Sequence, residues 1–176
     1  MSLQQKLRAV LWNEGITSRT EVYALLDGAR DERVYVYTQA SYLDKFCLYA
    51  GDLAPELAVT APWLVRLEPD NSSSNRLVSQ GWANGWGVFV RTETNSRKLQ
   101  KHFRRFLRVR DDSGRILIFR YYDPRILRIY LPTCTPAELT AFFGPVQQFL
   151  VGGLEETEVI EFALEGGKLR QTSIAL

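Results

Sequence analysis

The stretch VYALLDG, at residues 22–28, decides the fold of this sequence. Its first five residues are apolar and prone to form strands, and Asp27-Gly28 is a typical turn. A strand without alternating polar residues is expected inside a sheet, where both of its faces are covered. We therefore predict that residues 22–26 form a buried strand, which leaves the sheet through a turn at Asp27 and Gly28.

Three further segments are predicted to be strands around it. A proline restricts the residue before it to extended conformations, so AP at residues 61–62 introduces a strand at residues 63–67. GWG at residues 85–87 leads into a strand at residues 88–90. ILIF at residues 116–119 is a continuous apolar run, which is typical of a central strand covered on both faces.

Helical spacing and capping residues predict several short helices. The apolar residues Leu3, Leu7, Val10 and Leu11 predict a helix that ends near Gly15. Residues 76–84 could form a second. TPAE at residues 135–138 supplies an N-cap, a first-turn proline and a capping-box acid for another helix, which stops before GP at residues 144–145.

Three segments are less decisive. VYVY at residues 34–37 has the composition of a strand, whereas the acidic pair at residues 31–32 suits the start of a helix, so both readings stay open. Residues 41–47 have the pattern of a capped helical turn. Residues 69–75 (PDNSSSN) have the composition of an exposed loop.

The C-terminal part of the chain differs in composition. The largely apolar run at residues 159–164 is separated from residues 168–176 by Gly166-Gly167, which predicts a β-hairpin or two edge strands. Because strands and helices do not alternate strictly, the expected class is α+β, with a single mixed, mostly antiparallel sheet, several short helices and this C-terminal β-hairpin extension. We expect an N-terminal helix in residues 1–21, a main domain in residues 22–151 and the extension in residues 152–176.

Composition excludes several classes of protein. With 176 residues, 45% of them hydrophobic and 24% charged, the chain is expected to fold into one domain without a metal or disulfide staple. It has no apolar run of membrane-spanning length and no signal-peptide pattern, so a cytoplasmic location is expected. The single histidine, His102, removes most zinc-site and triad chemistries. We therefore expect that the protein is not an enzyme, and that it has no catalytic residue, no metal and no cofactor. We expect Cys47 and Cys134 to be inert core residues.

Charge is distributed unevenly along the chain. Residues 97–128 contain eleven Lys or Arg and three Asp, a local charge of +8 in a chain whose net charge is +2. Within this segment, residues 96–108 are expected to form an amphipathic helix with Leu99 and Phe103 on its apolar face. The basic face could bind phosphates, with tryptophan and tyrosine rings stacking on bases, but packing of the apolar face against a core and solvation of the charged face explain the pattern better. His102 is expected on the flank of this helix, without a catalytic task.

FRYYDPR, at residues 119–125, is the densest group of chemically distinctive residues. The planar guanidinium groups of Arg120 and Arg125, framed by aromatic residues, could form a surface that recognises a partner. Alternatively, Asp123-Pro124 turns the chain and Asp123 pairs with one of the two arginines. Both readings stay open. GWANGWG, at residues 81–87, lacks the spacing of nucleotide-binding glycine loops, so it is not expected to bind a nucleotide.

These landmarks occur in an order that resembles a known family. YALLDGA at residues 23–29 is followed by APWLV at residues 61–65, the Trp86-Gly87 pair, LQKHFRRFL at residues 99–107, FRYYDPR and FFGP at residues 142–145. The series resembles the bacterial type VI secretion effector chaperones, also called adaptor or Tap/TEC proteins, over about residues 22–151. FRYYDPR and FFGP are its most specific parts.

The resemblance implies a cytoplasmic, non-enzymatic chaperone or adaptor that binds a toxic type VI effector and helps load it onto the valine-glycine repeat spike protein. It implies these two protein partners, no small-molecule substrate and no membrane, with nucleic-acid binding as the weaker alternative. Residues 22–151 would be the adaptor domain. Only residues 152–176 follow it, and an edge strand there could bind the effector by strand addition.

The expected site residues form two groups. The partner-binding side chains are expected to be Arg97, Lys101, Arg104, Arg108, Arg120, Tyr121, Tyr122 and Arg125. The residues expected to maintain the shared structure are Asp27, Gly28, Pro62, Trp86, Asp123, Pro124, Phe143, Gly144 and Pro145.

Overall fold

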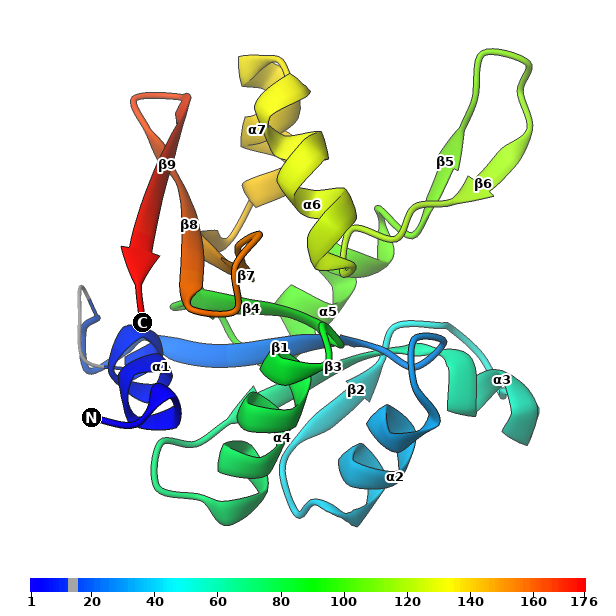
Figure 1. Cartoon of the computed structure of the whole chain (residues 1–176). Helices are drawn as coiled ribbons and strands as arrows, with labels where there is room; N and C mark the ends of the chain where they lie inside the picture. The colour runs from blue at the N-terminus through cyan, green and yellow to red at the C-terminus, as the bar shows by residue number, and fades with distance from the viewer. Residues whose placement is uncertain (13–15) are drawn as a thin grey trace.

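The computed structural model describes residues 1–12 and 16–176, which form a layered α+β fold, as predicted. In these residues, seven strands form one antiparallel sheet in the order β2-β3-β1-β4-β7-β8-β9, and β5 and β6 form a separate ribbon (Figure 1). The elements are α1 (Leu3–Trp12), β1 (Glu21–Asp27), α2 (Glu32–Ala40), β2 (Lys45–Cys47), α3 (Pro55–Thr60), β3 (Pro62–Leu67), α4 (Ser72–Ala83), β4 (Gly87–Thr92), α5 (Ser96–Arg104), β5 (Arg108–Arg110), β6 (Ile116–Ile118), α6 (Pro124–Tyr130), a 3-10 turn (Leu131–Thr133), α7 (Pro136–Phe143), β7 (Val146–Gly152), β8 (Glu158–Glu165) and β9 (Lys168–Ala175).

Strand β1 lies inside the sheet between β3 and β4, as its apolar sequence predicts. Its alternate residues face two separate cores. Tyr23 and Leu25 belong to the core under α5, α6 and α7, whereas Ala24 and Leu26 belong to the core under α1, α2 and α4. Because helices cover both faces of the sheet, β1 needs apolar side chains at consecutive positions. The strands predicted at residues 63–67 and 88–90 are confirmed as β3 and β4.

The N-terminal helix is confirmed as α1, and its residues Leu7, Val10 and Leu11 are buried in the second core. The predicted end of this helix near Gly15 lies outside the described residues. A buried arginine in β4 holds the helix in place: Arg91 donates hydrogen bonds to the carbonyl oxygens of Val10 and Leu11 at the end of α1. The helix is therefore fixed to the sheet by apolar packing and by a cation at its C-terminus, where the helix dipole favours one.

Residues 34–37, which left two readings open, lie in helix α2. The Asp31 carboxylate caps this helix by accepting a hydrogen bond from the backbone N–H of Arg33 at 2.9 Å. The cap decides in favour of the helix although Val34 and Val36 are β-branched. The capped helical turn expected at residues 41–47 is wrong, because these residues lead into strand β2 and the Ser41 hydroxyl donates backward, to the Thr38 carbonyl at 2.8 Å.

The loop expected at residues 69–75 is wrong in its second half. Helix α4 begins at Ser72, so the serine run forms its first turn and the helix predicted at residues 76–84 is the remainder of it. The Asn71 side chain accepts hydrogen bonds from the backbone N–H groups of Ser73 and Ser74, at 2.8 and 3.2 Å. Capping by Asn71 therefore outweighs the loop-like composition.

The basic segment departs most from expectation. The helix predicted at residues 96–108 ends at Arg104, and Arg108 lies in strand β5. Residues 116–119 do not form a central strand, because β6 pairs with β5 alone and projects from the molecule (Figure 1). The side chains of Ile116, Leu117 and Ile118 are 56, 46 and 50% exposed. Burial was predicted here from the apolar composition alone. Strand β1 is buried because helices cover both of its faces, whereas the described helices do not cover the ribbon.

The C-terminal hairpin is confirmed as β8 and β9, joined by a two-residue turn in which Gly166 and Gly167 have positive φ angles of 57° and 77°. Strand β8 also pairs with β7, so the hairpin continues the main sheet. Its residues Ile160 and Phe162 belong to the first core. We conclude that removal of residues 152–176 would remove part of the core as well as an edge.

Helix α7 and the FFGP sequence that ends it are built as predicted. Thr135 and Glu138 form the capping box, and Gly144 ends the helix with a φ of 48°. The buried ring of His102 packs against this glycine, and its Nε2 donates to the Phe142 carbonyl oxygen at 2.7 Å. Burial is the main cause that lowers the pKa of His102. His102 therefore packs inside the protein, where it joins α5 to the end of α7.

Substitution of Gly144 tests this packing. A Cβ there would lie 2.5 Å from His102 Cε1, and the positive φ adds backbone strain. Gly144→Ala should therefore lower the free energy of unfolding by about 2 kcal/mol or more in urea titrations. Gly114→Ala is the matched control, because Gly114 has a φ of 82° with no atom within 4 Å of the added Cβ, and it should cost less. Equal losses in the two variants would show that the His102 contact contributes nothing.

Candidate functional site

Four of the predicted structural residues meet at one end of the central strands. The backbone N–H of Asp27 donates to the Trp86 carbonyl at 2.8 Å, and Asp27 lies opposite Pro62 in the β1–β3 pairing. The N–H of Gly28 donates to the Ala61 carbonyl at 3.1 Å. A Cβ on Gly28 would lie 2.4 Å from that same oxygen, so only glycine fits. This end of the sheet is where the site is assembled.

FRYYDPR brings two arginines and a second carboxylate to the same place. Arg120 donates a hydrogen bond to the carboxylate of Asp27 and lies 3.6 Å from that of Asp123. Arg125 donates to both oxygens of Asp123, at 3.0 and 2.6 Å. The two carboxylates are 2 and 3% exposed, so each needs a cation beside it. The four side chains form one network, in the order Asp27, Arg120, Asp123 and Arg125.

Asp123 also starts helix α6. Its Oδ1 accepts a hydrogen bond from the backbone N–H of Arg125 at 3.0 Å, and Pro124 occupies the first helical position. Burial opposes ionisation of Asp123, but the hydrogen bonds and charges of Arg125 and Arg120 outweigh it and lower the pKa of this carboxyl. The structural reading of FRYYDPR is therefore confirmed: Asp123 turns the chain and pairs with both arginines.

The two tyrosines of FRYYDPR lie inside the protein. Tyr121 is fully buried and Tyr122 is 2% exposed. The Tyr121 hydroxyl donates to the Phe103 carbonyl at 2.9 Å, and the two rings stack with centroids 5.6 Å apart. Burial raises the pKa of both tyrosines. The expectation that their rings contact a partner is wrong for the folded chain, because they pack in the first core.

Trp86, the remaining landmark of this end, is buried as well. Its Nε1 donates to the Asp31 carboxylate at 3.1 Å, and the guanidinium of Arg33 lies 5.4 Å from its ring centroid. Asp31 therefore caps α2 and fixes Trp86 at the same time. The Arg33 hydrogen bond is the main cause that lowers the pKa of Asp31 to about 2.

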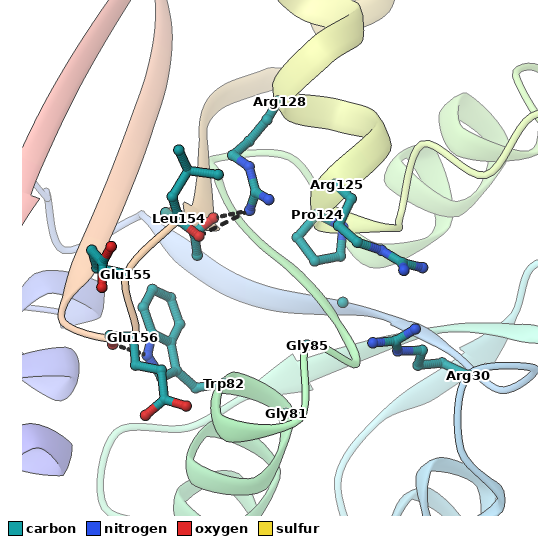
Figure 2. Close-up of a pocket in the computed structure, with 13 residues that line it drawn as sticks. Arg30, Gly81, Trp82, Gly85, Pro124, Arg125, Arg128, Leu154, Glu155 and Glu156 are labelled. Carbon is teal, nitrogen blue, oxygen red and sulfur yellow. Dashed lines mark hydrogen bonds between the residues drawn. The ribbon is translucent and has the colours of Figure 1, made fainter.

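Arg125 continues from the network into a small cleft. The cleft has a volume of about 160 Å³. It lies between the end of α4, the start of α6 and the loop between β7 and β8 (Figure 2). Arg128 donates to the carbonyl oxygens of Gly152 and Gly153, and Trp82 Nε1 donates to the Glu156 carbonyl at 2.8 Å. These bonds hold the walls together. The cleft is a structural junction with Arg30 and Arg125 at its rim.

The basic helix α5 is amphipathic over residues 96–104, with Leu99 and Phe103 buried beneath it. Arg97 and Lys101 are exposed on its outer face. Arg104 is engaged within the fold, because its Nη2 donates to the carbonyl oxygens of Cys47 and Tyr49, both at 3.0 Å.

The expected binding residues thus divide between three environments. Arg97, Lys101 and Arg108 are exposed, Arg104 holds the segment after β2, and Arg120 and Arg125 belong to the carboxylate network. Pro145 lies at the other end of β4, where its carbonyl accepts a hydrogen bond from Thr92 at 2.7 Å. Phe143 is buried in the first core.

Two features of the site were missed from the sequence. Helix α6 was read only as a turn, although Asp123-Pro124 followed by RILRIY carries the cap and first-turn proline of a helix. Arg91 was not singled out, although it is a charged residue at the end of the apolar strand 88–90 and is 2% exposed. A charge in such a position signals a buried partner set, and here Gln148 Oε1 also accepts from it at 2.8 Å.

The two cysteines, which were expected in the core, are only partly buried. Cys47 and Cys134 are unpaired thiols of intermediate exposure, and burial raises the pKa of both. Cys134 packs against the first core. Among residues 1–12 and 16–176, no group of His, Cys, Asp and Glu side chains is arranged to hold a metal ion. In the same residues no helix has the length and apolarity needed to cross a membrane.

The carboxylate network predicts a pH-dependent stability. The pKa of Asp123 is lowered in the folded chain, so its charge stabilises the fold above its unfolded pKa of 3.8 and this contribution is lost as the pH falls through the folded value. Asp123→Asn keeps a capping side chain but removes the charge. Its deficit in unfolding free energy should be largest above about pH 5 and shrink toward pH 2. A deficit that does not change with pH would contradict this role.

Asp123→Ala removes the cap in addition. It should lower the free energy of unfolding by about 1 kcal/mol more than Asp123→Asn, which corresponds to a further loss of about 2–4 °C in melting temperature for a chain of this size. Thermal melts at pH 7 measure the difference, and equal melting temperatures for the two variants would show that the cap is dispensable.

Comparison with known proteins places the shared landmarks in one family. The family model described as "Domain of unknown function (DUF4123)" matches residues 22–141, which is most of the chain and contains VYALLDG, the basic helix, FRYYDPR and most of α7. No curated protein and no solved structure gives a significant match. The family is associated with adaptors of type VI secretion effectors, in keeping with the resemblance seen in the sequence. On the strength of this match the chain belongs to the DUF4123 family.

Proposed function

We propose that the protein is a cytoplasmic, non-enzymatic adaptor that binds a type VI secretion effector and helps load it onto the valine-glycine repeat spike protein. The observation that carries the proposal is the match of residues 22–141 to a family associated with such adaptors. An adaptor that binds an exposed segment of its cargo stabilises that segment by mass action, and it must release the cargo during secretion.

The sheet separates two surfaces that could serve two partners. The basic helix α5 contacts the segment after β2 through Arg104, and β2 is one edge strand of the sheet. Strand β9 is the opposite edge. With six steps between neighbouring strands of about 4.8 Å each, these edges lie on the order of 29 Å apart. An adaptor needs such a separation if it binds cargo and carrier together.

Strand β9 offers backbone groups for strand addition by the effector. The N–H of Leu176 donates to the Thr157 carbonyl at 2.7 Å, which fixes the alternation of hydrogen bonds along the β8–β9 pair. By this alternation Lys168, Arg170, Thr172 and Ile174 bond to β8. The intervening residues Leu169, Gln171, Ser173 and Ala175 direct their N–H and C=O groups outward. An extended cargo segment could pair with those groups.

Nucleic-acid binding is less well supported by the site. A single-stranded nucleic acid would need exposed rings on which its bases can stack. The sequence offers Trp82, Trp86, Tyr121 and Tyr122 for this role; the last three are buried, and Trp82 is partly buried at the cleft beside α6. The exposed cations Arg97 and Lys101 are left without stacking partners from this group.

Affinity purification of the tagged chain from its native host, with and without nuclease treatment, tests the proposed function. The proposal predicts that mass spectrometry identifies a spike protein, a toxin-like polypeptide or both after nuclease treatment. Recovery of nuclease-sensitive material alone would contradict the adaptor role and favour nucleic-acid binding.

Strand addition at β9 predicts a selective effect of proline. Gln171→Pro removes an outward N–H, which an edge strand tolerates because the bond to β8 is not involved. It should reduce recovery of the effector about tenfold while the far-ultraviolet circular dichroism stays unchanged. Gln171→Ala, which keeps the N–H, is the control. Undiminished recovery with Gln171→Pro would assign cargo binding to another surface, and deletion of the hairpin is unsuitable because β8 contributes to the core.

A further inference from the structure

The β5–β6 ribbon exposes apolar side chains that no core layer covers. Val109, Ile116, Leu117 and Ile118 are 39–56% exposed. The cross-strand pairs Arg108 with Ile118 and Arg110 with Ile116 share one face of the ribbon, whereas Val109 and Leu117 share the other. The first face therefore combines two guanidinium groups with two aliphatic side chains.

The Arg108–Ile118 pair at the base of this face lines a cavity of about 590 Å³. The opposite wall comes from the segment after β2 and from α3, and the floor from buried leucines of the core. The lining residues are Leu48, Tyr49, Ala50, Leu53, Leu57, Arg104, Leu107, Arg108 and Ile118. The volume lies within the range of about 300–1,000 Å³ that is usual for binding pockets.

The charges around this cavity are of one sign on the ribbon side. The charged residues that line it are Arg104 and Arg108. Residues 96–110, which lead into the ribbon, contain seven Lys or Arg and no Asp or Glu. Across the cavity, Asp52 and Glu56 flank the apolar lining residues Leu53 and Leu57 without lining it themselves. A ligand therefore needs apolar groups for the floor and an anionic group for the ribbon side.

Three other occupants fit less well. A second copy of this chain would bring two basic surfaces together. A membrane would meet the tip of the ribbon, where Asp111 and Asp112 place carboxylates. A nucleic acid would satisfy the arginines but leave Ile116 and Ile118 in water. A polypeptide with apolar and acidic side chains satisfies both kinds of surface.

We propose that the β5–β6 ribbon and this cavity bind an acidic, apolar segment of the spike protein onto which the effector is loaded. The inference rests on the proposed function. The ribbon, the basic helix and the cavity all lie within residues 22–141, the part shared with the family, whereas β9 lies outside it. A carrier that many adaptors share is expected to bind the part of the chain that the family shares. Cargo that differs from one adaptor to another is expected to bind outside that part. Apolar side chains of the segment lie between Ile118 and Leu57, and its carboxylate pairs with Arg108.

Site-specific photo-crosslinking in the native host tests the proposal. The photoreactive residue benzoylphenylalanine replaces Ile118 in one variant of the full chain and Leu57 in another. Both positions are exposed, at 50 and 51%, so the fold should tolerate it. Ile129, which is 73% exposed on α6 outside the cavity, is the matched control. Sequencing of the crosslinked peptides should give the same segment of the spike protein from both positions, with apolar residues and a net negative charge, and not from Ile129.

Charge reversal provides the second measurement. Arg108→Glu should lower the yield of the Ile118 crosslink about tenfold or more, whereas Arg108→Lys, which keeps the charge, should lower it less. Arg108 is exposed, so the melting temperature should stay the same in both variants.

The outcomes separate this inference from the function on which it rests. Crosslinks to the effector, to a second copy, to lipid, to nucleic acid or to a basic segment overturn the inference. Failure of Ile118 and Leu57 to crosslink, while spike protein and effector still co-purify with the chain, overturns it and leaves the adaptor function standing. Recovery of neither protein with the unmodified chain overturns both.

Discussion

The contact between Arg120 and the buried carboxylate of Asp27 joins the end of the central strand β1 to the segment that leads into helix α6. Asp27 ends the central strand, and Arg120 precedes helix α6, which covers the first core. A buried carboxylate without a cation would carry a large desolvation cost, so the fold requires the segment 119–125 to return to the end of β1. Asp123 and Arg125 extend the same pairing to the start of α6. The position of the arginines in FRYYDPR is thus a condition of the fold.

This arrangement changes what the arginine-rich part of the chain can do. Guanidinium groups that satisfy buried carboxylates or backbone carbonyls hold elements together, as Arg91, Arg104 and Arg128 also do. Three other cations of this part, Arg97, Lys101 and Arg108, are exposed and lie on α5 and at the base of the ribbon. Binding chemistry is therefore concentrated there, beside the exposed aliphatic side chains of β6.

Much of the fold could be predicted from local sequence, and the exceptions have physical causes. The strand at β1 and the capping box of α7 are specified by apolar run and cap residues, and both are confirmed. ILIF at residues 116–119 has the same kind of composition as VYALL, but what covers a strand depends on where the chain places the helices. Tyr121 and Tyr122 were assigned to a surface because aromatic residues beside arginine are typical of recognition sites. The burial of Tyr121 depends on contacts with Phe103 and Phe142, which are distant in sequence.

Simultaneous binding of two partners is the central requirement of an adaptor, and the two edges of the sheet give it a structural basis. The most direct measurement is a sedimentation or light-scattering titration in which the spike protein is added to the purified complex of this chain with its effector. The account predicts a ternary complex that contains all three proteins, because α5 contacts β2 through Arg104, and β2 and β9 are opposite edges of the sheet. Displacement of the effector by the spike protein would contradict it, since the two partners would then compete for one surface.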